Sequence, residues 1–247
     1  MTSSSPSSDF AELQTSFWNR WNAEVREHGQ GEVSQRQRQV ILQWLDELGL
    51  CDGALIEVGC GAGWLLGDLL KYGAVTGTDL ADEVLRRAQQ RVPEARLVAG
   101  DFMALDFPAA AYDVVVCCEV LSHVPDQQAF VARLAWLLKP GGHLMLATQN
   151  RPVLRRNHVP PQAPGQLRRW VDRSELRALL APHFEVERMF TATPLCNRGP
   201  LRLATSYKLR HALRPVIGHA YEGLLERLGL GWTIMALARR RGRPQNG

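Results

Sequence analysis

The sequence lacks several features that would place the protein outside the ordinary globular class. It has no run of roughly 18 or more apolar residues, so we expect no membrane-spanning helix. Its five cysteines are an odd number without CxxC spacing, which argues against a disulfide framework or a zinc site and favours a reducing cytoplasm. The opening MTSSSPSSD has no apolar stretch behind it, so residues 1–9 are expected to be a disordered tail rather than a secretion signal.

Lysine is scarce as well, with 3 Lys against 26 Arg, and the charge is unevenly distributed. The 247 residues are 45% hydrophobic and 22% charged, which is typical of one large globular domain. The net charge of +4 combines −8 over residues 1–149, +9 over 150–214 and +3 over 215–247. The basic character therefore lies in one third of the chain, which matters when partners are assigned.

From residue 54 onward, short apolar runs alternate with helical stretches. Strands are predicted at 54–58, 74–78, 96–99, 113–118, 143–148, 184–190 and 232–238. Helices are predicted near 63–71, 82–91, 126–138, 173–181 and 204–228, and Asp172 with Glu175 resembles a capping box. Strands that are solid apolar runs, each followed by a helix, indicate an α/β fold with a parallel sheet covered on both faces.

Three regions do not follow this alternation of strands and helices. Residues 10–50 contain two predicted helices, at 10–27 and 33–49, and are expected on the substrate side as a lid. Residues 51–247 would form the main domain, with helical and basic insertions at 150–172 and 195–230. No second domain is predicted.

A glycine-rich loop stands where the first strand of this domain turns into a helix. In the run Glu57-Val58-Gly59-Cys60-Gly61-Ala62-Gly63, the glycines allow a sharp turn and a close approach to a ligand, and the helix offers free N–H groups to an anion. Dinucleotide-binding folds use a similar turn, but here the third glycine follows the second by two residues rather than three.

Two carboxylates follow the next two strands. Asp79 ends the second strand, where it can accept hydrogen bonds from a ribose diol. Asp101 follows the third strand in GDFMALDF with Phe102 beside it, and an acceptor next to an aromatic ring suits an adenine.

Together the runs EVGCGAG, GDFMALDF, DVVVCCEVLSHV and LLKPGGHLML resemble class I S-adenosylmethionine-dependent methyltransferases over roughly residues 52–150. The resemblance implies a Rossmann-like seven-stranded sheet, mostly parallel with an antiparallel last strand. It also implies that S-adenosylmethionine is the cofactor and S-adenosylhomocysteine the product. The implied cofactor-binding residues are Glu57, Gly59, Gly61, Gly63, Asp79, Leu80, Asp101, Phe102, Cys118 and Arg38.

The run CEVLSHVPD most resembles the ubiquinone-biosynthesis O-methyltransferases and related small-molecule enzymes, which carry E-x-x-E-H there. Ser122 replaces their second carboxylate, and Mg²⁺ prefers several oxygen ligands, so no metal is expected. Glu119 and His123 are the candidate catalytic residues. A neutral imidazole, with a pKa near ~6.5, can accept a hydroxyl proton at physiological pH.

Structural alternatives stand beside several of these roles. Asp101 could cap the turn that follows it, Glu57 could brace the glycine loop, and His123 could simply pack. The aromatic residues Phe17, Trp18 and Trp21 could form a lid or belong to the core.

The basic segment allows three interpretations. Its cations are Arg151, Arg155, Arg156, Arg168, Arg169, Arg198, Arg202, Lys208, Arg210 and Arg214. They could bind an anionic small-molecule substrate, attract the protein to an anionic membrane through the helix near 204–228, or form a solvated face. No nucleic acid is expected, because no aromatic residues are interleaved with these cations.

The sequence therefore predicts a cytoplasmic methyltransferase that acts on a small molecule, at a hydroxyl in the first instance. Methylation of nitrogen, sulfur or carbon remains open, as does a protein that binds S-adenosylmethionine without methylating anything. The sequence names neither the acceptor nor the oligomeric state.

Overall fold

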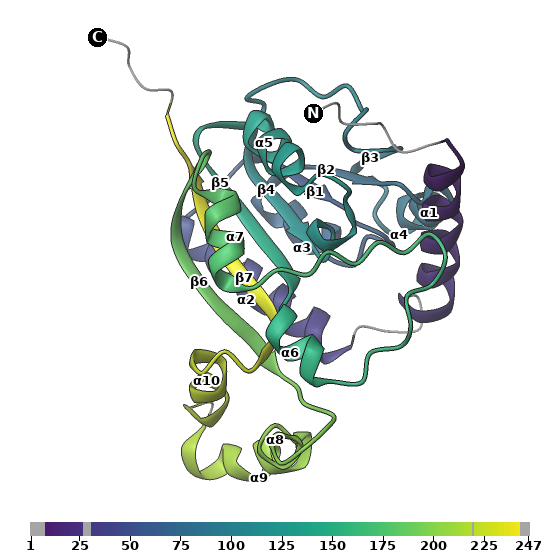
Figure 1. Ribbon diagram of the computed structural model, residues 1–247. Helices are drawn as coiled ribbons and strands as arrows, with labels where there is room; N and C mark the ends of the chain where they lie inside the picture. Colours follow the sequence, from purple (N-terminus) through teal and green to yellow (C-terminus); the bar gives the residue numbers. More distant parts are fainter. Residues whose placement is uncertain (1–7, 27–30, 219, 243–247) are drawn as a thin grey trace.

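A computed structural model describes residues 8–26, 31–218 and 220–242 of the chain (Figure 1). The tail expected over residues 1–9 lies outside the described residues, apart from Ser8 and Asp9, which begin the first helix. Within the described ranges, no helix is long and apolar enough to cross a membrane.

The centre of the molecule is a seven-stranded sheet in the order β3-β2-β1-β4-β5-β7-β6. Strands β1 to β5 pair in parallel, whereas β7 runs antiparallel to both β5 and β6. All seven predicted strands are confirmed, as is the antiparallel last strand. Their bounds are β1 (Gly53–Val58), β2 (Gly73–Asp79), β3 (Arg96–Ala99), β4 (Tyr112–Cys118), β5 (Leu138–Gln149), β6 (Phe184–Pro194) and β7 (Gly231–Arg240).

Helices cover both faces of the sheet, as Figure 1 shows for α5 and α7 on one side and α2 on the other. The helices are α1 (Ser8–Trp21), α2 (Glu32–Leu48), α3 (Leu66–Leu69), α4 (Asp82–Arg91), α5 (Gln127–Leu137), α6 (Arg151–Arg156), α7 (Arg173–Leu180), α8 (Leu201–Ala204), α9 (Tyr207–Ile217) and α10 (Ala220–Arg227). Short turns of other helix types lie at Asn22–Arg26, Leu70–Tyr72 and Leu121–His123.

The core consists of two layers because strand side chains alternate between the faces. On β4, Val115 packs with α5 and α7, whereas Val114 and Val116 pack with α2, α3 and α4. Complete burial of a side chain such as Leu134 contributes about 1.5–3 kcal/mol. This explains why the strands are nearly continuous apolar runs.

Local sequence signals set several helix boundaries. The predicted capping box is confirmed at α7, where Asp172 accepts from the amides of Ser174 and Glu175 and Glu175 accepts from the amide of Asp172. Asp126 caps α5 by accepting from the amide of Ala129 at 2.9 Å. These caps satisfy amide groups that have no partner inside the helix.

Two predicted helices are wrong in extent. The helix expected near 204–228 is interrupted after Ile217, because Gly218 adopts a left-handed φ of 57°. The helix expected near 63–71 begins only at Leu66, since Gly63 also has a positive φ. The helix expected over 10–27 is confirmed as far as Arg26, with its last five described residues in a wider π-helical turn.

Candidate active site

One large cavity of about 1430 Å³ lies along the carboxyl ends of the parallel strands. Open α/β sheets bind ligands at this edge, and ligand cavities usually measure about 300–1,000 Å³. This cavity is larger than that, and its wall is formed by two groups of segments. We call them the cofactor half (residues 57–62, 64–65, 78–80, 100–103 and 118–120) and the acceptor half (α1, α2, residues 149–170, Thr193, Leu195 and Trp232). Residues 123–126, 129 and 130 line the cavity where the two halves meet, and Gly63 does not line it.

The glycine loop is a sharp turn that only glycine tolerates. Gly59, Gly61 and Gly63 have φ angles of 76°, 50° and 75°. The amides of Gly59 and Cys60 both donate to the carbonyl of Thr78 on β2, at 2.7 and 3.0 Å. A Cβ on Gly59 would stand 2.1 Å from the side chain of Val120. The loop is therefore fixed between β2 and the end of β4 and lies directly on the cavity.

Asp79 braces this loop. Its two carboxylate oxygens accept from the amides of Gly61 at 2.8 Å and Ala81 at 2.9 Å. Burial raises the pKa of Asp79, and these hydrogen bonds oppose the rise. Because each carboxylate oxygen accepts more than one hydrogen bond, Asp79 can hold the loop and still receive donors from the cavity.

Asp101 lies on the cavity and also caps a turn, as the structural alternative predicts. Its carboxylate accepts from the amide of Met103 at 2.9 Å, and the side chain is exposed. Its neighbour Phe102 is buried and packs edge-on against Phe130, with ring centroids 5.4 Å apart. Both residues are part of the cavity wall.

The other predicted cofactor residues also line the cavity, but their surroundings differ. Glu57 is buried under the loop, and Leu80 and Cys118 are partly buried. Arg38 forms a two-pronged ion pair with Asp68, both bonds being 2.6 Å. The guanidinium of Arg38 is therefore already bound to a carboxylate of the protein.

His123 stands where the two halves meet and is held by hydrogen bonds on both ring nitrogens. Its Nδ1 lies 2.6 Å from the carbonyl of Leu167 and must carry the proton, because a carbonyl only accepts. Its Nε2 is therefore an acceptor and faces the side-chain amide of Gln149 at 3.4 Å. The hydroxyl of Ser122 donates to the other end of Gln149. Burial lowers the pKa of His123 to about 4, so the ring is neutral at physiological pH.

Glu119 joins a second polar cluster on the floor of the cavity. One of its carboxylate oxygens accepts from Gln37 of α2 at 2.6 Å and from the hydroxyl of Thr233 on β7 at 3.3 Å. Glu119 has a left-handed φ of 63°, a backbone conformation that residues other than glycine rarely adopt. Where such residues do adopt it, they cluster at functional sites.

The first helix contacts the point where the two halves meet. Trp18 packs edge-on against His123 with centroids 4.7 Å apart, and Gln14 donates to the carbonyl of His123. Just after this helix, the side-chain oxygen of Asn22 would lie 3.1 Å from a Cβ on Gly61. Phe17 is buried, as the core alternative predicts, whereas Trp21 is exposed at the cavity. A role of this cluster as a lid stays a prediction.

Sequence reasoning missed most of the acceptor half. Thr193 has a left-handed φ of 59°, and its buried hydroxyl has no hydrogen-bond partner. Its amide donates to Glu226 of α10 at 3.2 Å, and Glu226 in turn pairs with Arg36 of α2. These contacts join residues 33 to 190 positions apart, so no local sequence pattern marks them.

The basic segment does not line the cavity as a block. Arg151 pairs with Asp172 and Glu175, and the buried Arg210 pairs with Glu32. Arg168 lines the cavity and donates to the carbonyls of Pro160 and Pro161, and burial lowers its pKa. The side chain of Arg214 lies outside the described residues. The remaining cations (Arg155, Arg156, Arg169, Arg198, Arg202 and Lys208) are exposed.

The described wall carries more carboxylates than cations. Its acidic residues are Glu32, Glu57, Asp79, Asp101, Glu119 and Asp126, and its basic residues are Arg38 and Arg168. Among the described residues, no group of three or more His, Cys, Asp or Glu side chains is arranged to hold a metal ion.

Comparison with known proteins matches residues 56–146 to the methyltransferase domain family. The matched residues run from β1 to β5 of the sheet. The chain is 39% identical over 118 residues to the ubiquinone biosynthesis O-methyltransferase of Albidiferax ferrireducens, an alignment that covers 44% of this chain and 47% of that one. The chain thus spans about half the length of the curated relatives it matches.

Two solved structures share the fold of this chain. One is a Haloferax volcanii methyltransferase in complex with the Trm112 activator (TM-score 0.65, 19% identity, 91% of this chain and 98% of that one). The other is the Burkholderia thailandensis 1,6-didemethyltoxoflavin-N1-methyltransferase with bound 1,6-didemethyltoxoflavin and S-adenosylhomocysteine (TM-score 0.64, 21% identity, 98% of this chain and 93% of that one).

Proposed function

We propose that the protein transfers a methyl group from S-adenosylmethionine to a hydroxyl of an uncharged small molecule. The observation that carries this proposal is one cavity lined both by the glycine loop and by His123, whose Nε2 is the unprotonated ring nitrogen. The resemblance to ubiquinone biosynthesis O-methyltransferases at 39% identity supports oxygen as the methylated atom.

The residues of the cofactor half fit S-adenosylmethionine. The tight turn at Gly59–Gly63 lets the backbone approach the amino-acid portion, Asp79 accepts from the ribose hydroxyls, and Asp101 accepts from the adenine amine. When bound, S-adenosylmethionine supplies an electrophilic methyl group. Cys118 and Glu119 lie on the cofactor half, and the side chain of Glu119 contacts Gln37 of the acceptor half.

The acceptor half favours an apolar, uncharged molecule over an anion. Its wall contains Trp21, Leu154, Trp170 and Trp232, and its cations Arg38 and Arg168 already bind Asp68 and the carbonyls of Pro160 and Pro161. An anion taken out of water would therefore gain little from these cations, whereas an aromatic or aliphatic body would bury apolar surface. The polar floor at Gln37 and Thr193 is the part that can orient the reacting hydroxyl.

His123 would act as the proton acceptor. The hydrogen bond from Nδ1 to Leu167 leaves Nε2 as the acceptor, which is the tautomer that a general base requires. Its lowered pKa keeps the ring uncharged but makes it a weak base. Most of the acceleration would therefore come from holding the reactants together and excluding water, which Trp18 and the first helix promote.

Nitrogen is the second candidate acceptor atom. The weak basicity of His123 favours it, because a neutral amine needs little help from a base before transfer. One solved structure of the same fold is named as an N1-methyltransferase.

The experiment is an assay for methylated product and released S-adenosylhomocysteine, with matched phenols and anilines as acceptors. We expect methylated phenols, and a fall of roughly 100-fold in turnover for His123→Ala at unchanged S-adenosylmethionine affinity. Methylated anilines without methylated phenols, at a rate indifferent to His123→Ala, would assign the reaction to nitrogen. Tight cofactor binding with no methylated product would contradict both candidates.

A further inference from the structure

The three helices α8, α9 and α10 form a separate group beyond the end of β6, which we call the helical lobe (residues 198–228) (Figure 1). It contacts the sheet mainly where α10 lies against β6. Inside this contact, Leu225 and Glu226 are buried. By the outer side of the lobe we mean the side of its described residues that faces away from this contact with β6.

The outer side of the lobe is rich in exposed leucine. Leu203, Leu228, Leu224 and Leu209 are 75%, 64%, 53% and 37% exposed. They are four of the nine exposed large apolar side chains in the described part of the chain, although the lobe is a short segment. Such a concentration in one short segment is typical of a region that binds a partner.

The exposed charges of the lobe have one sign. Among its described residues, the exposed charged side chains are Arg198, Arg202, Lys208 and Arg227. Its two carboxylates are turned inward: Glu226 is buried and pairs with Arg36, and Glu222 lies near the buried Arg210. The partner that fits this surface therefore carries negative charge.

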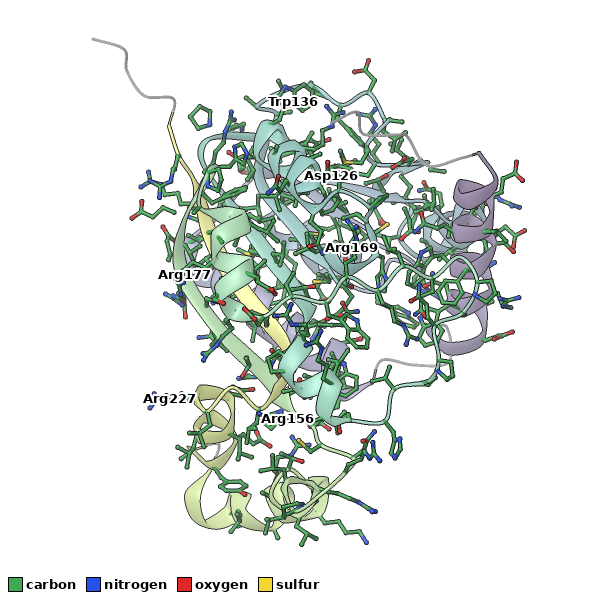
Figure 2. The ribbon with its side chains drawn as sticks, viewed as in Figure 1. Asp126, Trp136, Arg156, Arg169, Arg177 and Arg227 are labelled. Atoms are coloured by element: carbon green, nitrogen blue, oxygen red, sulfur yellow. The ribbon has the colours of Figure 1, made fainter. Side chains whose placement is uncertain are left out.

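Helix α10 shows how leucine and cation share one surface. Leu224 and Leu228 lie one turn apart, since the amide of Leu228 donates to the carbonyl of Leu224 at 3.0 Å. Arg227 lies beside them and points outward in Figure 2, whereas Leu225 and Glu226 face β6. The helix thus presents apolar and cationic groups together on its free face.

We propose that the helical lobe binds the surface of a bilayer that contains anionic lipid. The leucines would enter the boundary between headgroups and acyl chains while the cations contact lipid phosphates, as in other peripheral amphipathic surfaces. A nucleic acid matches the charge but gives no reason for four exposed leucines.

This surface is joined to the cavity wall. Glu226 of the lobe accepts from the amide of Thr193, and Arg210 pairs with Glu32, both of which line the cavity. The lobe therefore joins its free face, which would bind the bilayer, to the wall of the acceptor half.

The test is co-sedimentation of the full chain with vesicles of phosphatidylcholine alone or mixed with phosphatidylglycerol. We expect binding only to the mixed vesicles, weakened at high salt. The variant Arg202→Glu/Arg227→Glu should lower the partition coefficient about tenfold or more, since each cation near an anionic surface is worth roughly fivefold. The control Arg96→Glu/Arg177→Glu makes the same change in net charge at exposed sites on β3 and α7 and should bind like wild type.

A second pair of variants tests the leucines. Leu224→Ser should weaken binding, whereas Leu13→Ser, at an equally exposed position on α1, should not. Binding to neither vesicle, equal binding to both, or equal losses in the two charge variants would overturn the proposal. So would binding to a duplex RNA probe in place of vesicles. The thermal unfolding midpoint of each variant checks that these exposed substitutions leave the fold intact.

Discussion

The two halves of the cavity are built in different ways. The cofactor half comes from the turns after consecutive strands β1, β2, β3 and β4, and its shape depends on backbone conformation at glycines such as Gly59 and Gly61. The acceptor half is assembled from α1, α2, the 150–172 segment and the ends of β5, β6 and β7. The first half is therefore fixed by local rules, whereas the second depends on contacts between distant segments.

The halves also differ in how their polar groups are satisfied. In the cofactor half, Asp79 binds backbone amides, which hold the same geometry whatever side chains surround them. In the acceptor half, Gln149 and His123 depend on each other, and Thr193 has no partner for its hydroxyl. Substitutions in the first half should therefore act on the cofactor, and those in the second on the acceptor.

The largest effect is expected from Gly59→Ala. The new Cβ would stand 2.1 Å from Val120 at a φ of 76°, which costs roughly 3–5 kcal/mol in strain and overpacking. We expect a lower unfolding midpoint and at least about a tenfold loss of S-adenosylmethionine affinity. Gly67→Ala is the matched control, because its Cβ would meet only Val92 at 4.0 Å in a helix. Equal behaviour of the two variants in calorimetry and thermal unfolding would contradict this account of the loop.

A smaller effect is expected in the pH dependence of the folding stability, to which His123 contributes. Its pKa is lowered from 6.5 to about 4, so the unfolded chain binds the proton more readily than the folded one. The contribution of His123 to the free energy of unfolding is fully present above pH 6.5. It falls by roughly 3 kcal/mol as the pH falls toward 4. Urea unfolding from pH 7.5 to 4 should therefore show a smaller decline in His123→Gln than in wild type. Parallel curves would mean that the imidazole is not buried as described.

The smallest effect is expected from Thr193→Val, which removes the hydroxyl and keeps the shape. If this hydroxyl binds the acceptor, KM for the acceptor should rise about threefold to tenfold while S-adenosylmethionine affinity stays the same. Thr193→Ser retains the hydroxyl and should behave like wild type. A change in cofactor affinity, or an unchanged KM, would remove Thr193 from the acceptor half.

The contrast between the halves explains what the sequence could predict. The strands and the cap at Asp172 follow from periodicity and short-range hydrogen bonding, and the structure has them. The order of the strands in the sheet comes from the structure alone. The glycine loop was visible because glycines stand at the end of an apolar run. The roles proposed for these residues remain predictions, since the structure gives their positions alone.

The rest needed the tertiary structure. The low pKa of His123 is caused by burial, to which the edge-on contact with Trp18 contributes, and the hydrogen bond to residue 167, 44 positions away, opposes it. The conformation of Thr193 has no signal in its neighbours, because β-branched residues seldom adopt a positive φ. The prediction of one long helix near 204–228 is wrong for a simpler reason, because Gly218, with its positive φ, is itself a signal for the end of a helix.

The most direct measurement is calorimetry of S-adenosylmethionine and S-adenosylhomocysteine binding to wild type, Asp79→Asn and Asp113→Asn. Asp113 also accepts from a backbone amide, that of Ala54, but at the opposite edge of the sheet. The account predicts binding of both ligands by wild type and Asp113→Asn, and an affinity about tenfold lower or worse in Asp79→Asn, because the amide replaces an acceptor by a donor. Failure of wild type to bind either ligand, or equal affinities in all three proteins, would contradict it.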